Sequence, residues 1–435
     1  MFPWHIQKVV GPSAMLNSSI WGLGIKVFGA AVAFLSNVLI ANYLGATNSG
    51  YYYYLLSFLG LATAFSVFGG QSFILKAVPV LYSRGEQESA SQLIVGVAVR
   101  TVIFSLIFLS LLVLGVEVFH AQLPVILVQN AALPYLAAAL PFVAANVILS
   151  HALQVQGRLV LAFFTSGLSH SLLFVLGIAI SRPETSQSLS IIYLYTSVAV
   201  FSHLLFLTWG SLRRGSIIKG IKAISVRPSS QFFIVQMALE LIVQLPVILL
   251  GVLGASPTAV AGYAIVSRIS LMLGFIYSIV NRIVMPQFAQ LHADRDWIEI
   301  ARVFRRSILI MAAVSLPAAA VFMLFPSRIL SLFGAEFAQY SNAFLILLLF
   351  QVINVLTGPA GNFLMMTDRQ RLFRNLVLVG SALVLSFGLI FIPRFDAAGA
   401  AVAVLLGYGF VNVSSFALSL RIIAIGKGSL HGASD

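Results

Sequence analysis

Several residue classes are scarce or missing in this chain. Cysteine is absent from the 435 residues, so no disulfide, thiol nucleophile or thiolate metal site can form. Charged residues make up 9% of the sequence, whereas soluble domains carry about 25%. No glycine-rich phosphate loop is present, which excludes ATP hydrolysis by a loop of that kind. The scarcity of charge, together with a 60% hydrophobic content and a mean hydropathy of +1.02, indicates a polytopic membrane protein.

Long hydrophobic runs predict about twelve membrane-spanning helices, because a span needs roughly 20 mainly apolar residues. The first run carries Lys26 and is too long for the core of a cleavable signal, so we expect it to be retained as a helix. The predicted spans are 16–43, 51–75, 93–115, 133–153, 159–180, 189–210, 232–253, 258–285, 307–333, 341–366, 373–393 and 397–420.

Lysine and arginine are distributed unevenly between the connections. If both termini are cytoplasmic, the cytoplasmic segments hold 18 of these residues and the opposite segments hold three, namely Arg182, Arg328 and Arg394. Positively charged loops stay on the cytoplasmic side during insertion. The sequence therefore predicts cytoplasmic termini, and the net charge of +13 needs no nucleic-acid partner to explain it.

The two halves of the sequence resemble each other at an offset near 210 residues. Both contain Leu-Gly-Ala, a short polar gap and Gly-Tyr, in LGATNSGY from Leu44 and LGASPTAVAGY from Leu253. Leu81 aligns with Leu291, and the segments after Asn146 and Asn354 also align. We expect a six-plus-six duplication, with bundles at 1–210 and 232–435 and a basic cytoplasmic linker at 211–231. Transporters built in this way bind substrate between their halves.

Three segments resemble the multidrug/oligosaccharidyl-lipid/polysaccharide exporter superfamily, and within it the Wzx-type O-antigen flippases. They are YLGATNSGYYYYLLSFLGLATAFSVFGG from Tyr43, SRGEQES from Ser83 and FDAAGAAVAVLLGYG from Phe395. The resemblance covers nearly the whole chain and implies an all-α integral membrane fold of two six-helix bundles around a central cavity. It also implies alternating access, a place in the bacterial cytoplasmic (inner) membrane, and a role in surface polysaccharide biosynthesis.

Four cations within the predicted spans are candidates for binding an anionic cargo: Lys26, Arg100, Arg268 and Arg282. A charge at mid-bilayer costs at least about 2.5 kcal/mol, so such residues usually face a cavity. Arg268 is too far from either interface for its side chain to reach water, whereas Arg100 and Arg282 lie near span ends and could snorkel. In related precursor flippases, cavity arginines on spans 1, 2 and 8 are the expected ligands. Lys26 and Arg268 resemble the first and last, but span 2 has no charge.

Span 7 carries the most specific local pattern, in which Gln236, Glu240 and Gln244 form one polar stripe at four-residue spacing. Glu240 is a candidate for H⁺ or Na⁺ coupling, for an ion pair with Lys26 or Arg268, or for accepting hydrogen bonds from sugar hydroxyls. Asn37 shares a helical face with Lys26. Further candidate sugar contacts are Asn146 and Asn354.

Aromatic residues and histidines in the spans have simpler expected roles. Tyr51 to Tyr54 are expected to form an aromatic belt at the membrane surface, with stacking on sugar rings as the alternative. His151, His170 and His203 lack the spacing of metal ligands, and we expect no metal site.

The sequence thus predicts a flippase, not an enzyme, that moves a polyprenyl-diphosphate-linked oligosaccharide to the outer leaflet. Two negative charges on the diphosphate match the mid-span cations. The expected partners are the lipid-linked substrate and membrane lipids, with glycan polymerase or ligase machinery as a further candidate. The alternatives are a drug or organic-cation antiporter, a glycan polymerase or ligase, and a non-transporting scaffold. The absence of a long external loop argues against the polymerase.

Overall fold

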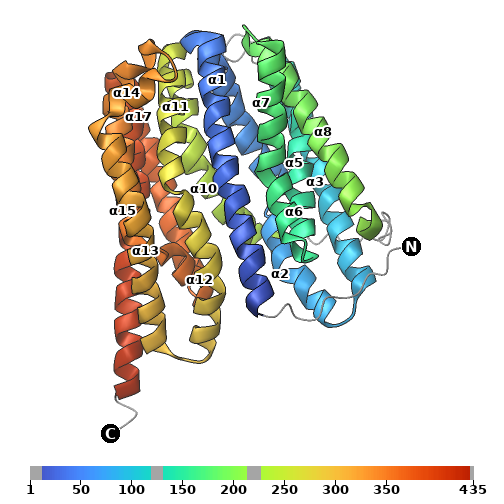
Figure 1. Cartoon of the computed structure of the whole chain (residues 1–435), viewed down its shortest axis with the longest axis vertical. Helices are drawn as coiled ribbons and strands as arrows, with labels where there is room; N and C mark the ends of the chain where they lie inside the picture. Colours follow the sequence, from blue (N-terminus) through green and yellow to red (C-terminus); the bar gives the residue numbers. More distant parts are fainter. Residues whose placement is uncertain (1–11, 119–130, 213–226, 432–435) are drawn as a thin grey trace.

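The computed structural model describes residues 12–118, 131–212 and 227–431, and every regular element in these ranges is helical (Figure 1). The first half contains α1 (Pro12–Val67), α2 (Gly70–Ser83), α3 (Gln87–Val118), α5 (Leu133–Val155), α6 (Leu159–Phe163), the π-helix η1 (Phe164–Leu168), α7 (Ser169–Ser181) and α8 (Ser186–Leu212). The second half contains α10 (Arg227–Val252), α11 (Pro257–Leu273), α12 (Phe275–Ala293), α13 (Trp297–Leu324), α14 (Pro326–Ser331), the 3₁₀-helix η2 (Ala335–Tyr340), α15 (Ser341–Thr357), α16 (Ala360–Met366) and α17 (Gln370–His431).

The membrane spans agree in number with the sequence prediction. Within the described ranges, nine helical segments are long and apolar enough to cross a membrane. Two of them contain a reversal, at Gly45 (φ 67°) in α1 and at Asp396 (φ 45°) in α17, so each comprises two spans. α11 and α12 follow each other through Gly274 and make the twelfth span. The fold is the predicted all-α membrane architecture of six plus six helices.

The predicted internal repeat recurs in the backbone. Three of the left-handed positions in the first half have a left-handed counterpart in the second half, at offsets of 209, 210 and 211 residues. Glycine reaches this conformation without steric cost, and Asp is among the residues that tolerate it best. The pairs are Gly45 (φ 67°) with Gly254 (φ 80°), Gly85 (φ 77°) with Arg295 (φ 57°), and Gly157 (φ 78°) with Asp368 (φ 62°). Most of the predicted linker 211–231 lies outside the described residues.

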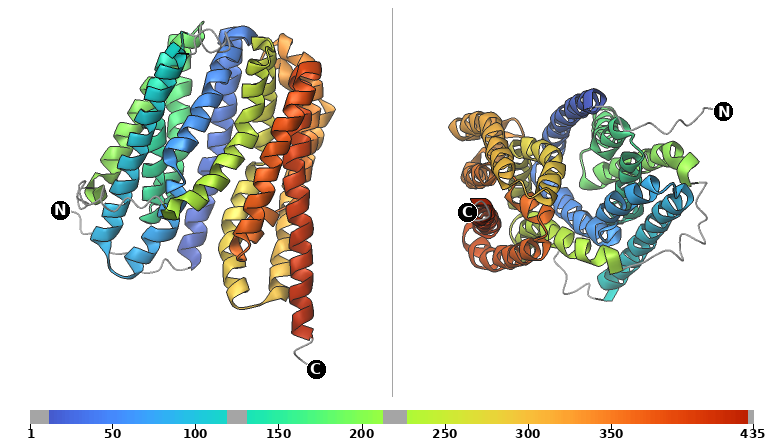
Figure 2. Two further views of the ribbon diagram at one scale, coloured as in Figure 1. Left: turned by 180° about the vertical axis from the view of Figure 1, so that it is seen from behind. Right: turned by 90° about the horizontal axis from the view of Figure 1, so that it is seen from below.

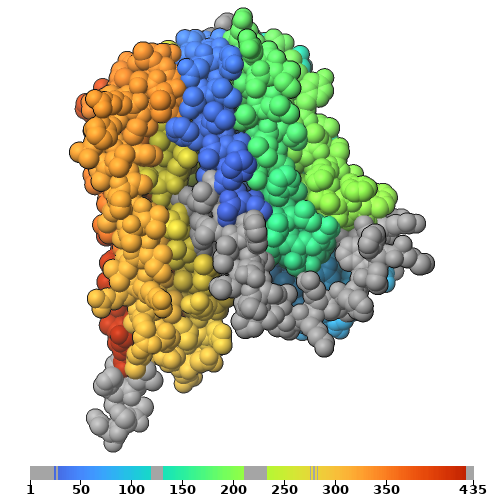
Figure 3. Space-filling view, viewed as in Figure 1, coloured from blue at the N-terminus to red at the C-terminus, as the bar shows by residue number. Residues whose placement is uncertain are grey.

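The bundle has two different ends. One end, which we call the basic end, holds the turns at 84–86, 156–158, 294–296 and 367–369, where arginines collect. The opposite end holds the reversals at Gly45 and Asp396 and the turns at 182–185 and 253–256. In Figure 1 the basic end is at the bottom, and α1 lies between the two halves. Figure 3 shows α1 filling the space between the halves at the opposite end.

Hydrophobic packing joins the halves at the opposite end. One core there combines residues of both halves, among them Tyr54, Ile178, Leu250 and Phe344. Towards the basic end, each half has a separate hydrophobic core. One core surrounds Ile148 in the first half, and the other consists of residues of the second half alone. The shared core closes the space between the halves at the opposite end, and the burial of apolar surface stabilises the closure.

Towards the basic end, the halves keep contact along one seam. Phe233 of α10 stacks on Phe68 at the end of α1, with ring centres 4.2 Å apart. Seen from behind in Figure 2, α10 runs diagonally from the first half at the basic end to the second half at the opposite end. This helix consequently borders both bundles, which brings its polar stripe to the interface.

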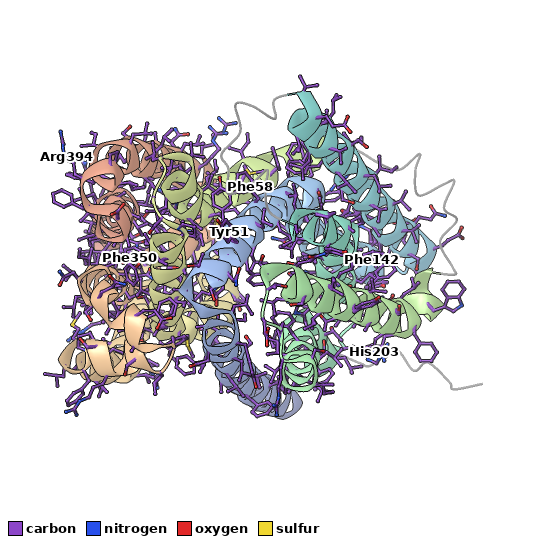
Figure 4. All side chains as sticks on the ribbon, turned by 90° about the horizontal axis from the view of Figure 1, so that it is seen from above. Tyr51, Phe58, Phe142, His203, Phe350 and Arg394 are labelled. Carbon is purple, nitrogen blue, oxygen red and sulfur yellow. The ribbon has the colours of Figure 1, made fainter. Side chains whose placement is uncertain are left out.

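The tyrosine run does not form the expected aromatic belt. Tyr52, Tyr53 and Tyr54 are at most 1% exposed and belong to the core shared by both halves. Figure 4, which looks onto the opposite end, places Tyr51 between the two halves, with Phe142 and His203 in one half and Phe350 in the other. The prediction was wrong because the reversal at Gly45 turns this segment inwards, where α10 and α11 pack against it.

Candidate functional site

Arg268 occupies the centre of the interface between the halves. It lies on α11, where Nη1 donates a hydrogen bond to the carbonyl of Ala264 at 3.1 Å. Its guanidinium carbon lies 4.3 Å from the centre of the Tyr53 ring, within the range of a cation–π contact. Tyr53 in turn donates its hydroxyl hydrogen to Oδ1 of Asn37 at 2.9 Å. Spans 1, 2 and 8 therefore meet through one chain of three side chains.

A polar cavity of 390 Å³ lies on one side of Arg268. α10 contributes Glu240 to its wall, and Glu240 Oε1 accepts a hydrogen bond from Gln244 Nε2 at 2.8 Å. The polar lining residues come from five helices of both halves: Thr63, Gln71, Tyr193, Gln236, Glu240, Gln244 and Arg268.

Gly60 allows span 2 to approach the polar stripe closely. A Cβ at this position would lie 2.6 Å from Gln244 Nε2 and 3.3 Å from Glu240 Oε1. A side chain there would collide with both groups or displace them. The glycine therefore positions span 2 against α10 and narrows the polar cavity to its observed width.

Glu240 and Arg268 line the same cavity without forming an ion pair. Neither residue belongs to the ion pairs His292–Asp368 and Arg302–Glu299 of the described part of the chain. The pairing of Glu240 with Arg268, one of the alternatives left open by the sequence, is absent from this structure. Lys26, the other alternative partner, has its side chain outside the described residues. The cavity thus presents a cation and a carboxylate that remain available to a ligand.

An apolar cavity of 470 Å³ lies on the other side of Arg268. α1 lines it with Ala33 and Asn37, and α11 with Arg268 and Met272. The first half also contributes Phe163, Ser166, Gly167, Leu168 and Ser171, three of which belong to the π-helix η1, and the second half contributes Phe333. Short π-helical segments inside α-helices are frequent at functional sites. Arg268 is shared by both cavities, so a molecule spanning them would pass this side chain.

The other predicted site residues lie elsewhere. Asn146 donates to the carbonyl of Ser197 within the first half. Asn354 donates to Gln351 Oε1 and accepts from Asn412 Nδ2, both at 3.1 Å, within the second half. Neither asparagine lines the two cavities.

Arg100 also has a position within one half. It is 3% exposed, donates to the carbonyl of Val67 at 3.3 Å and lies 5.7 Å from the centre of the Phe68 ring. These contacts lie where α1 ends before Gly69. Arg100 thus helps to stabilise the break between α1 and α2. Arg282 lies on α12, but its side chain, like that of Lys26, lies outside the described residues.

Sequence reasoning brought together Arg268, Glu240, Gln236, Gln244 and Asn37, and the structure places all five at the two cavities. It missed Tyr53, Gln71 and Tyr193. Gln71 could have been singled out from the sequence, because it is a polar residue directly after Gly69-Gly70 in an apolar segment. Nothing in the sequence distinguished Tyr53 from its neighbours, because its role depends on the position of Arg268.

Comparison with known proteins identifies the family of this chain. The family model described as polysaccharide biosynthesis protein matches residues 15–292, and the MatE model matches residues 232–391. The chain belongs to the polysaccharide biosynthesis protein family. No curated protein matches the chain.

Solved structures of the MOP superfamily share the fold of this family member. An inward-facing multidrug resistance MATE family transporter is 16% identical with a TM-score of 0.71, over 94% of this chain and 99% of that one. The lipid II flippase MurJ, in an inward closed conformation, is 16% identical with a TM-score of 0.72, over 92% and 87%. A MOP superfamily transporter from Pyrococcus furiosus, described as having a binding pocket of reversed polarity, is 14% identical with a TM-score of 0.64, over 94% and 95%. This protein therefore has the fold of a MOP-superfamily transporter.

Proposed function

We propose that this protein is a flippase that moves a polyprenyl-diphosphate-linked oligosaccharide from the cytoplasmic to the outer leaflet for surface polysaccharide or O-antigen biosynthesis. The observation that carries the proposal is the position of Arg268 between a polar and an apolar cavity. The chemical groups of a lipid-linked sugar follow the same order: an apolar chain, an anionic diphosphate and a polar glycan. The polysaccharide biosynthesis family model supports this class of cargo.

Arg268 is the residue proposed to bind the diphosphate. A guanidinium matches phosphate oxygens in bidentate geometry, and its charge compensates for the hydration that the diphosphate loses in the cavity. Its present partners are the carbonyl of Ala264 and the Tyr53 ring, neither of which carries a negative charge. Lys26, Arg100 and Arg282 remain proposed contributors, and Arg100 is the least suited because it lies within one half.

The apolar cavity is proposed to admit the prenyl chain. It is bordered by α1, α11 and the segment 163–171, and its lining is mainly aliphatic and aromatic. The chain would stay among these side chains and the membrane lipids while the sugars occupy the polar cavity. Gln236 and Gln244 offer amides for hydroxyl groups there, and Asn37 lies on the apolar side next to Arg268.

The proposed orientation makes this structure an inward-facing state. The arginines at the basic end support a cytoplasmic position for that end, and with it for both termini. The shared core at the opposite end then closes the protein towards the outside. In alternating access, loading would take place in this state, and release would require the shared core to part. Either a coupled ion such as H⁺ or Na⁺, or consumption of the cargo outside, would drive net flux.

Mass spectrometry of lipid-linked sugars from depleted cells tests the proposal. Depletion should cause one polyprenyl-diphosphate oligosaccharide to accumulate, and its mass identifies the cargo. Complementation with Arg268→Ala should leave the accumulation in place, because loss of hydrogen bonds to a charged group costs about 1.5–3 kcal/mol, or roughly 10- to 150-fold in affinity. Arg394→Ala, at an exposed arginine seen at the rim in Figure 4, is the matched control and should restore export.

Absence of any accumulating glycolipid in depleted cells would overturn the flippase proposal. The second candidate is then an organic-cation antiporter, which Glu240 favours because a carboxylate in the polar cavity suits a cationic drug. Its test is drug susceptibility: expression of the chain should raise resistance to cationic compounds, and Glu240→Gln should remove that resistance.

A further inference from the structure

A short connection of the second half reaches α1 at the opposite end. It comprises residues 325–340, which follow α13 and contain α14 and η2, and we call it the strap. In Figure 3 this part of the chain, in orange, lies beside α1. Gly334 in the strap has φ 135° and ψ 146°, a backbone conformation that is almost restricted to glycine. This glycine permits the sharp turn that follows Phe333, whose side chain is fully buried.

The two ends of the strap are attached to the second half. Near its start, the hydroxyl of Ser327 lies 3.0 Å from that of Ser341 on α15. At its end, the ring of Tyr340 covers Gly262 of α11, where an added Cβ would lie 2.4 Å from the ring. These contacts couple the strap to α11 and α15, so we expect it to move with the second half.

The tip of the strap contacts the first half through two interactions. The ring of Phe333 packs edge-on against Phe34 of α1, with ring centres 5.3 Å apart and an interplanar angle of 85°. Asn42 Nδ2, also on α1, donates an exposed hydrogen bond to the carbonyl of Leu332 at 3.0 Å. Both interactions join residues of different halves. They can break when the halves separate, because water can replace the exposed hydrogen bond.

Phe333 also forms part of the wall of the apolar cavity. Among the described residues that line this cavity, Phe333 alone comes from a connection, whereas the others belong to spans 1, 5 and 8. The strap lies at the opposite end, so Phe333 closes the cavity on that side. An apolar molecule that leaves the cavity in this direction has to pass between Phe333 and Phe34.

We propose that the strap is the outer gate of the apolar cavity and that Phe333 is its blocking side chain. In this state Phe333 packs against Phe34 and keeps the cavity closed towards the opposite end. When the halves separate there, the strap moves away from α1 with the second half and opens a path between the two rings. That the molecule passing the gate is a prenyl chain rests on the proposed function, but the gate acts on any occupant.

Thiol labelling from the two sides of the membrane tests the gate. The chain has no cysteine, so Ser171→Cys places a single thiol in the cavity with little change in size. An impermeant maleimide is added to membrane vesicles of either orientation that contain the full-length protein. We expect slow labelling from the opposite end. Phe333→Ala should raise that rate at least about tenfold, because loss of a buried ring strongly destabilises a packed contact. Phe337→Ala is the matched control: this strap residue is equally buried but does not line the cavity, so the rate should stay low.

A milder pair of variants covers the case in which Phe333→Ala does not fold. Asn42→Ala removes the hydrogen bond to Leu332 between the halves and should raise labelling from the opposite end by about 2- to 13-fold. Asn48→Ala removes a hydrogen bond of the same kind, from Nδ2 to the carbonyl of Glu184 at 3.2 Å, but within the first half. This control should leave the rate unchanged.

Two results would overturn the gate. One is an unchanged labelling rate from the opposite end in both Phe333→Ala and Asn42→Ala. The other is an equal increase in the test and control variants, because it would reflect a general loosening of this end. The assay contains no cargo, so neither result bears on the flippase proposal, which depends on the glycolipid that accumulates in depleted cells.

Discussion

Replacement of Gly50 by alanine should weaken the seal at the opposite end. Gly50 follows the reversal at Gly45 and packs against the start of α11, where an added Cβ would lie 1.8 Å from the carbonyl oxygen of Pro257 and 3.0 Å from its Cα. The obstructing atoms are backbone, so no side chain can rotate away. The two halves must instead separate by more than an ångström at this point.

The size of the effect follows from the cost of overpacking. Inserting a methyl group into a well-packed core typically costs 1–3 kcal/mol. This contact joins the halves only while the opposite end is closed, so the penalty falls on the closed state alone. A difference of about 1–3 kcal/mol changes the ratio of two states roughly 5- to 150-fold. Gly50→Ala should shift the population towards opening at this end by that factor.

Distance measurements between spin labels check this prediction. The chain has no cysteine, so Thr47→Cys and Leu253→Cys, both exposed at the opposite end but in different halves, can be labelled without background. Gly50→Ala should add or enlarge a longer-distance population in this pair. Gly115→Ala is the matched control. Both substitutions raise helix propensity, but a Cβ at position 115 meets nothing within 4 Å. Identical distance distributions in both variants would refute the role assigned to the Gly50–Pro257 contact.

Two further substitutions separate ligand binding from stability. Tyr53→Phe removes the hydroxyl that donates to Asn37 but keeps the ring beside the guanidinium. We expect a loss of about 0.5–1.5 kcal/mol, or roughly 2- to 13-fold in affinity for a prenyl diphosphate probe, measured by titration. An unchanged affinity would show that this hydrogen bond does not position the cation site. Asn354→Leu breaks the bonds to Gln351 and Asn412 in the second half and should lower the thermal unfolding midpoint in detergent, with probe affinity unchanged. A loss of affinity at constant stability would instead return Asn354 to the binding site.

The sequence alone determined the features that depend on composition and on local order. Hydropathy gave the number of spans, since each span must by itself satisfy its backbone and match the bilayer. The repeat was visible because Gly45 and Gly254 both occupy turns that favour glycine. Arg268 and Glu240 stood out because charges are expensive within a membrane, whatever the fold around them.

The tertiary structure decided which of these residues meet. Asn146 and Asn354 satisfied the same sequence criterion as Asn37, yet they bond within a single half. Tyr53 became part of the site because the reversal at Gly45 turns it towards α11, where Arg268 lies above its ring. The π-helix at 164–168 and the lack of a pair between Glu240 and Arg268 also depend on helices far apart in the chain. Local patterns fix which face of a helix is polar, but only packing between distant helices determines what that face contacts.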